Sequence, residues 1–218
     1  MITTLINKEL RLSVNPWLYT FLAMALLLFI PSWVFFIALA YLFLFFVTLG
    51  QMDKANGDLT FACSLPIPKS SIVTARAITV VIIEVAELVL AGLVSIARYW
   101  LYPEGNLAGM GMNTNLAFFG VMLVMYTIFN LVYLPGSYKR AYRMLWPLAG
   151  GSLIAVVIGG LLTYLLALQP TLAGIFNDRG FGHPWAQVLL FAAGLIVYAG
   201  LTLIAHRKAV SNFAKVDL

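Results

Sequence analysis

The chain has few of the residues that build disulfide frameworks, metal centres or hydrolytic sites. It contains one cysteine, Cys63, and two histidines, His183 and His206, in 218 residues. A single cysteine allows no disulfide within the chain. The two histidines fall on opposite sides of the membrane in the topology derived below, so they cannot share a metal. Because no segment forms a phosphate-binding glycine loop and no catalytic spacing is present, we expect a non-enzyme without its own cofactor or metal.

Charged residues are also scarce. They make up 10% of the chain, whereas 62% of the residues are hydrophobic and the mean hydropathy is +0.97. A soluble domain of this composition would expose too much apolar surface. We therefore predict an all-α polytopic membrane protein. Its basic residues flank apolar stretches, so we expect them to contact the lipid bilayer and not nucleic acid.

Six apolar stretches are predicted to cross the membrane as helices. They are 17–30, 33–49, 72–98, 115–134, 146–168 and 184–206. The first two together would measure roughly 50 Å as one helix, too long for a core of about 30 Å, so Pro31-Ser32 is expected to be a tight turn. A single bent span would instead place the N-terminus outside and break the charge pattern. All five tryptophans fall at predicted span ends, as is typical of head-group level.

The thirteen Lys and Arg residues determine the predicted orientation. Only Arg98 and Arg179 fall on one side of this topology. The others lie in the N-terminus, alternate loops and the C-terminus: Lys8, Arg11, Lys54, Lys69, Arg76, Lys139, Arg140, Arg143, Arg207, Lys208 and Lys215. Because short loops rich in positive charge stay in the cytoplasm, both termini are expected there.

The largest cytoplasmic loop is predicted to contain a short helix. Asn56 or Asp58 can cap it, and Pro66 and Pro68 end it. A helix at about 56–65, joined stiffly to two spans, would suit the transmission of force from a cytoplasmic partner. Taken alone, these residues are equally compatible with a simple connecting loop.

The predicted domain is a single unit. Its parts are an amphipathic interfacial helix at 1–16, spans one and two at 17–50, the cytoplasmic loop at 51–71, spans three to six at 72–206, and a cytoplasmic tail at 207–218.

The run from Ser64 to Arg76, SLPIPKSSIVTAR, resembles a signature between spans two and three of small bacterial ABC exporter permeases. The C-terminal run SNFAKVDL is similar to the basic Asp-Leu ending of that family. The likeness follows the whole chain in span order. Pro68 stands where the family usually has Ser or Thr, and the Pro31-Ser32 turn is shorter than is common, which leaves the cargo open.

This resemblance implies a type-two ABC transporter membrane domain in the bacterial inner membrane, without its own ATPase. It would pair with a second permease, identical or a close paralogue, and with two ATPase subunits that bind ATP and Mg. The interfacial helix would be the family's elbow helix and the loop helix its coupling helix. The residues expected to contact the ATPase are Asp58, Leu59, Phe61, Ala62 and Leu65.

Two carboxylates fall within the third predicted span. Glu84 and Glu87 lie roughly 10 and 15 Å into the membrane, where an ionised carboxylate is costly unless it is neutralised, paired or hydrated. Steps of three and four place them on one helix face with Ala91, Ser95 and Arg98. We expect this face at the translocation path or the dimer interface.

Two roles remain open for Glu84 and Glu87. They contact cationic groups of the cargo, or they are protonated or hydrogen-bonded to neighbours. The candidate neighbours on span four are Tyr126, Asn130 and Tyr133.

Two further patterns predict contacts between helices. Gly151, Ala155 and Gly159 form a ladder of small residues for close helix packing. On span six, a polar stripe is expected to form interhelical hydrogen bonds; it consists of Tyr198, Thr202 and His206.

The predicted function is ATP-driven export of an amphipathic or cationic peptide or another hydrophobic compound. The competing prediction is a secondary transporter that moves protons through Glu84 and Glu87. Inverted repeats and broken helices, which are typical of such transporters, are not seen in the sequence. A membrane-embedded enzyme and a scaffold without transport activity are the remaining classes.

Overall fold

The computed structural model describes residues 2–31, 33–102, 111–139, 145–178 and 182–216, and these ranges contain helices, turns and connecting segments but no strand. The predicted all-α membrane fold is confirmed. The long helices are α3 (Leu42–Asn56), α5 (Lys69–Leu101), α6 (Leu116–Ser137), α7 (Leu145–Leu168) and α9 (Pro184–Ala214). The shorter elements are α1 (Ile2–Lys8), the π-helix η1 (Glu9–Ser13), the 3₁₀ helix η2 (Pro16–Phe29), α2 (Phe35–Ala40), α4 (Asp58–Ser64) and α8 (Pro170–Phe176).

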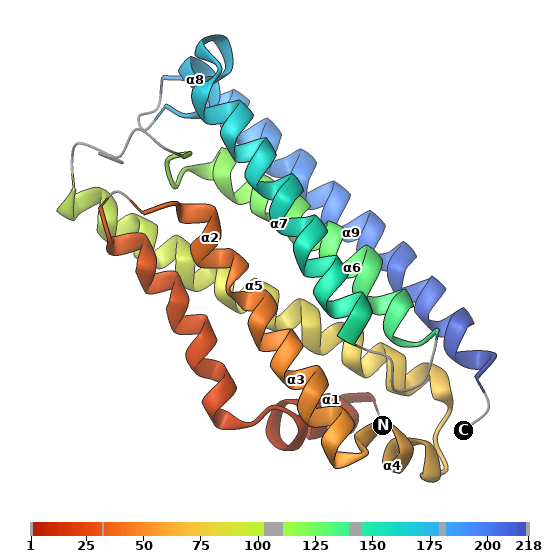
Figure 1. Cartoon of the computed structure of the whole chain (residues 1–218). Helices are drawn as coiled ribbons and strands as arrows, with labels where there is room; N and C mark the ends of the chain where they lie inside the picture. Colours follow the sequence, from red (N-terminus) through yellow and green to blue (C-terminus); the bar gives the residue numbers. More distant parts are fainter. Residues whose placement is uncertain (1, 32, 103–110, 140–144, 179–181, 217–218) are drawn as a thin grey trace.

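The long helices lie alongside one another in one bundle (Figure 1). One end of the bundle carries α4 and both chain termini, and the other end carries α8 (Figure 1). We name the first the basic end, because helix termini there bear Lys8, Lys54, Lys69 and Lys215. Some residues named in the predictions lie outside the described residues. They are Ser32 of the predicted turn, the basic residues Arg140, Arg143 and Arg179, and Asp217 and Leu218 of the predicted tail.

Five helical stretches in the described ranges are long and apolar enough to cross a membrane. They are Phe35–Asn56, which combines α2 and α3, together with α5, α6, α7 and α9. A sixth crossing is counted when the N-terminal pair of helices is taken as one bent span.

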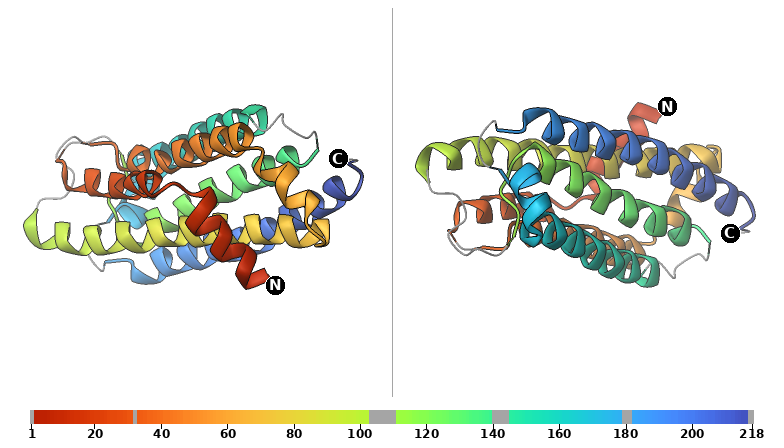
Figure 2. Two further views of the ribbon diagram at one scale, coloured as in Figure 1. Left: turned by 90° about the horizontal axis from the view of Figure 1, so that it is seen from below. Right: turned by 90° about the horizontal axis from the view of Figure 1, so that it is seen from above.

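The N-terminal helices α1, η1 and η2 form a bent pair, which we call the elbow. Its two parts, Ile2–Arg11 and Pro16–Phe29, are bent by 78°, and the first part projects from the side of the bundle (Figure 2). The second part, η2, is a 3₁₀ helix of 14 residues, so a rise of about 2.0 Å per residue extends it to about 28 Å. The same residues as an α-helix would measure only about 21 Å. The 3₁₀ geometry therefore lets a short predicted span approach the thickness of the membrane core.

Helix α6 is the centre of the packing, with its most extensive contacts to α9 and α7. It meets α9 backbone to backbone: a Cβ atom on Gly120 would lie 2.7 Å from the Leu190 carbonyl oxygen, and one on Gly194 would overlap the Gly120 carbonyl oxygen. Stacked rings join α6 to α3, with the centroid of Phe129 4.7 Å from that of Phe43 and 5.3 Å from that of Phe46.

The predicted ladder of small residues lies against α6. Ala155 is fully buried, and Cβ atoms on Gly151 and Gly159 would press against Val132 and Met125 of α6.

Several predicted helix ends differ from the structure: α3 continues beyond Leu49 to Asn56, and α5 continues beyond Arg98 to Leu101. Helix α6 does not end at Leu134 but continues through Pro135 to Ser137, and the Pro135 carbonyl accepts a hydrogen bond from Asn212 Nδ2 at 2.9 Å. Helix α9 does not end at His206 but continues to Ala214, so most of the predicted tail is helical. The extension of α9 contains polar residues such as Arg207, Lys208 and Asn212, so hydropathy alone cannot detect it. The extension of α6 contains Pro135 and Gly136, which ordinarily indicate the end of a helix.

Candidate functional site

The short helix predicted in the cytoplasmic loop is α4, and it is shorter than the predicted range of 56–65. Gly57 has a positive φ of 63°, a conformation that suits glycine, and it separates α3 from α4. The extended backbone at Leu65 then ends α4. The N-cap position of α4 is Gly57, whereas Asn56 is the last residue of α3 and Asp58 lies in the first turn of α4, so the prediction that Asn56 or Asp58 caps this helix is wrong.

The residues predicted to contact an ATPase divide between two faces of α4. Leu59 and Ala62 are buried against the rest of the chain, at 8% and 6% exposure. Phe61 and Leu65 are exposed, at 57% and 38%. At the basic end, α4 therefore exposes two large apolar side chains, Phe61 and Leu65, beside the exposed Thr60 and Ser64.

Asp58 belongs to a group that we name the ion cluster: Lys8, Glu9, Asp53, Asp58 and Arg76. Arg76 of α5 is its centre, with Nε 2.9 Å from Glu9 Oε2 and Nη1 2.7 Å from Asp53 Oδ2. Asp58 pairs with Lys8 and lies 3.9 Å from Arg76. The ion cluster thus joins the N-terminal helices, α3, α4 and α5.

The electrostatics of the ion cluster explain why it holds together. Glu9, Asp53 and Arg76 are at most 7% exposed, so each needs an opposite charge. Burial raises the pKa of the Glu9 carboxyl, while Arg76 and Lys8 oppose that rise. The arrangement fixes the position of α4 relative to two other elements by charge as well as by packing.

The two carboxylates of α5 form a second group, which we name the carboxyl cluster: Glu84, Glu87, Tyr126, Asn130, Tyr198 and Thr202. Glu84 Oε2 accepts hydrogen bonds from the Tyr198 hydroxyl at 2.6 Å and from Asn130 Nδ2 at 3.0 Å. Glu87 Oε2 accepts one from the Tyr126 hydroxyl at 2.6 Å. These bonds join α5 to α6 and α9 in the interior of the bundle.

Two of the three predicted neighbours therefore bond to the carboxylates. The third, Tyr133, instead stacks on Phe129 with ring centroids 5.1 Å apart. The polar stripe on α9 also bonds to other helices: Tyr198 to Glu84, Thr202 to Asn130 at 3.4 Å, and His206 Nε2 to Thr74 at 3.0 Å.

The rest of the predicted α5 face also turns inward. Ala91 is fully buried, and Ser95 donates a hydrogen bond to its carbonyl at 2.7 Å. The Arg98 guanidinium lies over the Phe35 ring, 4.4 Å from its centroid. In this structure Glu84 and Glu87 are 0% exposed. The assignment of this face to a translocation path or a dimer interface stays a prediction.

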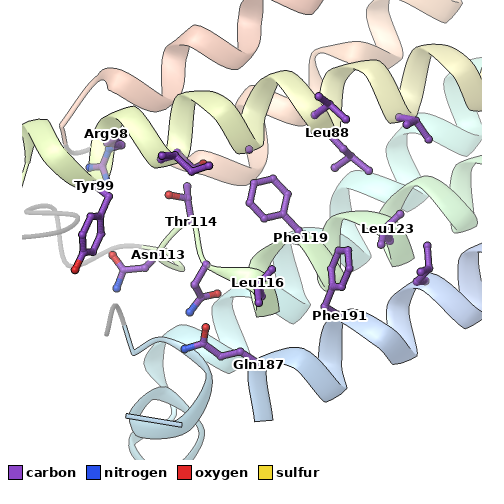
Figure 3. Close-up of a pocket in the computed structure, with 17 residues that line it drawn as sticks. Leu88, Arg98, Tyr99, Asn113, Thr114, Leu116, Phe119, Leu123, Gln187 and Phe191 are labelled. Atoms are coloured by element: carbon purple, nitrogen blue, oxygen red, sulfur yellow. The ribbon is translucent and has the colours of Figure 1, made fainter. Parts of the chain in front are cut away.

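A pocket of about 640 Å³ opens between α5, α6 and α9 toward the end that carries α8 (Figure 3). Leu88 of α5 lies opposite Phe119 and Phe191, and the walls are mostly apolar (Figure 3). Its polar lining residues are Ser95, Arg98, Tyr99, Asn113, Thr114, Asn115 and Gln187. The pocket can hold an apolar or amphipathic group.

Sequence reasoning missed the ion cluster. Its members are far apart in the sequence, and Arg76 was noted only for orientation and as the last residue of the family signature. The one available signal was that Asp53 and Arg76 flank the same loop with opposite charge.

Comparison with known proteins supports the resemblance. A family model described as ABC-2 family transporter protein matches residues 4–212, which is nearly the whole chain. No curated protein and no solved structure matches the chain.

Proposed function

This multi-pass membrane protein is a permease of the ABC-2 transporter family, and we propose that it is the membrane subunit of an ATP-driven exporter. The ATP and Mg would be bound by a separate ATPase, in two copies. A second permease, identical or a close paralogue, would complete the translocation path. The basic end would face the cytoplasm of a bacterial inner membrane, since its helix ends carry most of the described positive charge.

The observation that carries this proposal is the outward face of α4. Phe61 and Leu65 are exposed apolar side chains on a short helix at the end of the bundle. Exposed apolar residues outside the membrane mark a surface that another protein can cover. We propose that this surface docks into the ATPase as a coupling helix.

The ion cluster gives that coupling helix a mechanical link to the bundle. Asp58 of α4 pairs with Lys8 of the elbow and lies 3.9 Å from Arg76 of α5. A displacement of α4 would therefore be carried to α5, which continues through the membrane, and to the elbow. Packing of Leu59 and Ala62 against the bundle adds to this link.

The pocket between α5, α6 and α9 supports a cargo that is hydrophobic or amphipathic. Its walls are mainly aliphatic and aromatic, and Arg98 is its charged residue. Contact between a cationic cargo and Glu84 or Glu87 would require a different arrangement, because both side chains are fully buried in this structure. The pocket therefore favours an apolar portion of the cargo over a cationic one.

Charged substitutions on α4 test the proposal. Phe61→Glu and Leu65→Glu should each abolish co-purification of an ABC ATPase and ATP-dependent flux of a hydrophobic dye, with normal membrane insertion. Thr171→Glu, which changes an exposed residue of α8 at the opposite end, is the matched control and should change neither. The proposal fails if wild-type protein purifies from its native membrane without a nucleotide-binding partner, as a proton-driven transporter would.

A further inference from the structure

The carboxyl cluster leaves hydrogen-bond acceptors without donors when its carboxylates are treated as ionised. Three fully buried side chains in the described interior each have an oxygen without a partner: Glu84 Oε1, Glu87 Oε1 and Asn130 Oδ1. Asn130 is aimed into the cluster, because its Nδ2 donates to Glu84 Oε2. Buried polar atoms are nearly always paired, so three orphaned acceptors in one place indicate missing donors.

The charges around Glu84 and Glu87 also indicate that the two carboxyl groups are protonated. Glu84 and Glu87 lie one helical turn apart, so two ionised carboxylates there would repel each other. The groups that face them from the neighbouring helices are neutral: the hydroxyls of Tyr126, Tyr198 and Thr202, and the Asn130 amide. Among the described residues, no Lys, Arg or His forms an ion pair with either carboxyl. Burial of an unpaired charge is among the costliest arrangements in a protein interior.

We propose that the carboxyl cluster binds two protons, one on Glu84 and one on Glu87. A proton on Glu84 Oε1 turns that atom into a donor for Asn130 Oδ1. The Asn130 amide already donates to Oε2 of the same carboxyl, so acid and amide become paired through two hydrogen bonds. One proton in this way satisfies two of the three orphaned atoms.

The second proton removes the competition between two acceptors for the Tyr126 hydroxyl hydrogen. Its single hydroxyl hydrogen faces two acceptors, Glu87 Oε2 at 2.6 Å and the Leu39 carbonyl at 3.4 Å. A proton on Glu87 Oε2 donates to the Tyr126 oxygen, and the Tyr126 hydrogen is then released for Leu39. Glu87 Oε1 remains as a neutral carbonyl oxygen, which is far less costly to bury than a charge.

With both protons bound, the carboxyl cluster would be uncharged and would hold α5, α6 and α9 together through hydrogen bonds. The inference does not depend on the proposed export function, because it concerns only groups inside one chain. The ligand is the proton, and its competitor is a monovalent metal cation, which would offset one of the two carboxylate charges and coordinate the same oxygens.

Infrared spectroscopy of the purified full chain in lipid nanodiscs tests the proposal directly. Wild-type protein carrying ¹³C-labelled glutamate should show isotope-shifted bands of protonated carboxyl groups at neutral pH. Glu84→Gln and Glu87→Gln should each remove one component. Absence of such bands in the wild type, or their persistence in both variants, would overturn the proposal, and absence in the wild type decides even if a variant does not fold.

Thermal stability provides a second readout. The amide of Glu84→Gln can donate to Asn130 as the protonated acid does, so its melting temperature should stay within about 2 °C of wild type. Glu84→Leu removes the two hydrogen bonds with Asn130 and the one from Tyr198, and it should lower the melting temperature by more than about 5 °C. Equal losses in the two variants would contradict a protonated Glu84, as would stabilisation by Na⁺ over choline that Glu84→Gln abolishes.

Discussion

The ion cluster and the carboxyl cluster show two ways of burying acidic residues: in the first they lie against a cation of α5, and in the second they belong to α5 itself. In the ion cluster Glu9 and Asp53 are at most 6% exposed, and both meet the guanidinium of Arg76 within 3 Å. About two turns further along α5, Glu84 and Glu87 are fully buried and meet only hydroxyl and amide donors. Near the basic end, Arg76 of α5 and Lys8 of α1 supply the opposite charges. Deeper in the bundle the available neighbours are neutral, so hydrogen bonds from hydroxyl and amide groups replace ion pairs.

The largest effect is expected at the centre of the ion cluster. Arg76→Gln removes the cation that Glu9 and Asp53 share and leaves two buried carboxylates without it. Breaking a buried ion pair from one side costs about 3–5 kcal/mol, so the variant should unfold at a much lower temperature. Thermal unfolding in detergent, together with the yield of inserted protein, measures this effect.

Lys8→Met is the control for Arg76→Gln. The Lys8 side chain is 21% exposed and bonds near the surface, so its loss should cost less than about 1 kcal/mol. If Lys8→Met and Arg76→Gln were equally destabilising, the distinction between a buried centre and an exposed rim of the ion cluster would be wrong.

A pair of isosteric substitutions compares the two clusters directly. Asp53→Asn should cost about 1.5–3 kcal/mol, because it removes the negative charge that pairs with the buried Arg76 guanidinium but leaves an amide oxygen in its place. Glu87→Gln should cost less than about 1 kcal/mol, because Tyr126 can still bond to a neutral oxygen at that position. Unfolding midpoints of the two variants, measured in the same detergent, give the difference. A larger loss for Glu87→Gln than for Asp53→Asn would reverse the comparison.

The carboxyl cluster also depends on the close approach of α6 and α9. Gly194→Ala would push a methyl group into the Gly120 carbonyl and separate the helices that carry Asn130 and Tyr198. Overpacking of this kind typically costs about 1–3 kcal/mol, and we expect that loss in thermal unfolding.

Gly200→Ala is the matched control on the same helix. A Cβ atom at Gly200 would meet nothing within 4 Å, so this variant should be neutral or stabilising by up to about 1 kcal/mol. Equal losses at Gly194 and Gly200 would show that helix approach does not limit stability here.

The helices were largely predictable because hydropathy and tryptophan position report directly on membrane depth. Pro66 and Pro68 likewise limited the short helix that became α4. The bond between Tyr198 and Glu84 joins residues 114 positions apart, and its prediction would require the rotation of α5 against α9. Helical periodicity could place Tyr198 and Glu84 each on a polar stripe of its own helix, but it could not show that the two stripes face each other.

The charged residues of the ion cluster and the carboxyl cluster differ in how readily the sequence reveals them. Glu84 and Glu87 stood out because ionisable residues are rare in apolar spans. Arg76 and Glu9 did not, because each lies among other polar residues near a predicted span end, where charges are expected. Only the fold shows that these positions are buried.

The smallest predicted effect concerns Cys63 of α4, whose labelling tests on which side of the membrane the ion cluster lies. As the sole cysteine, it should react with a membrane-impermeant maleimide in inside-out vesicles and not in right-side-out ones. Burial raises the pKa of its thiol, although Lys69 opposes the rise, so the thiolate fraction at neutral pH is reduced. We therefore expect labelling a few-fold slower than in denatured protein, with a rate that increases as pH rises toward the thiol pKa. Labelling from the exterior of intact cells would place α4 and the ion cluster outside, where no ATP-binding partner could reach Phe61.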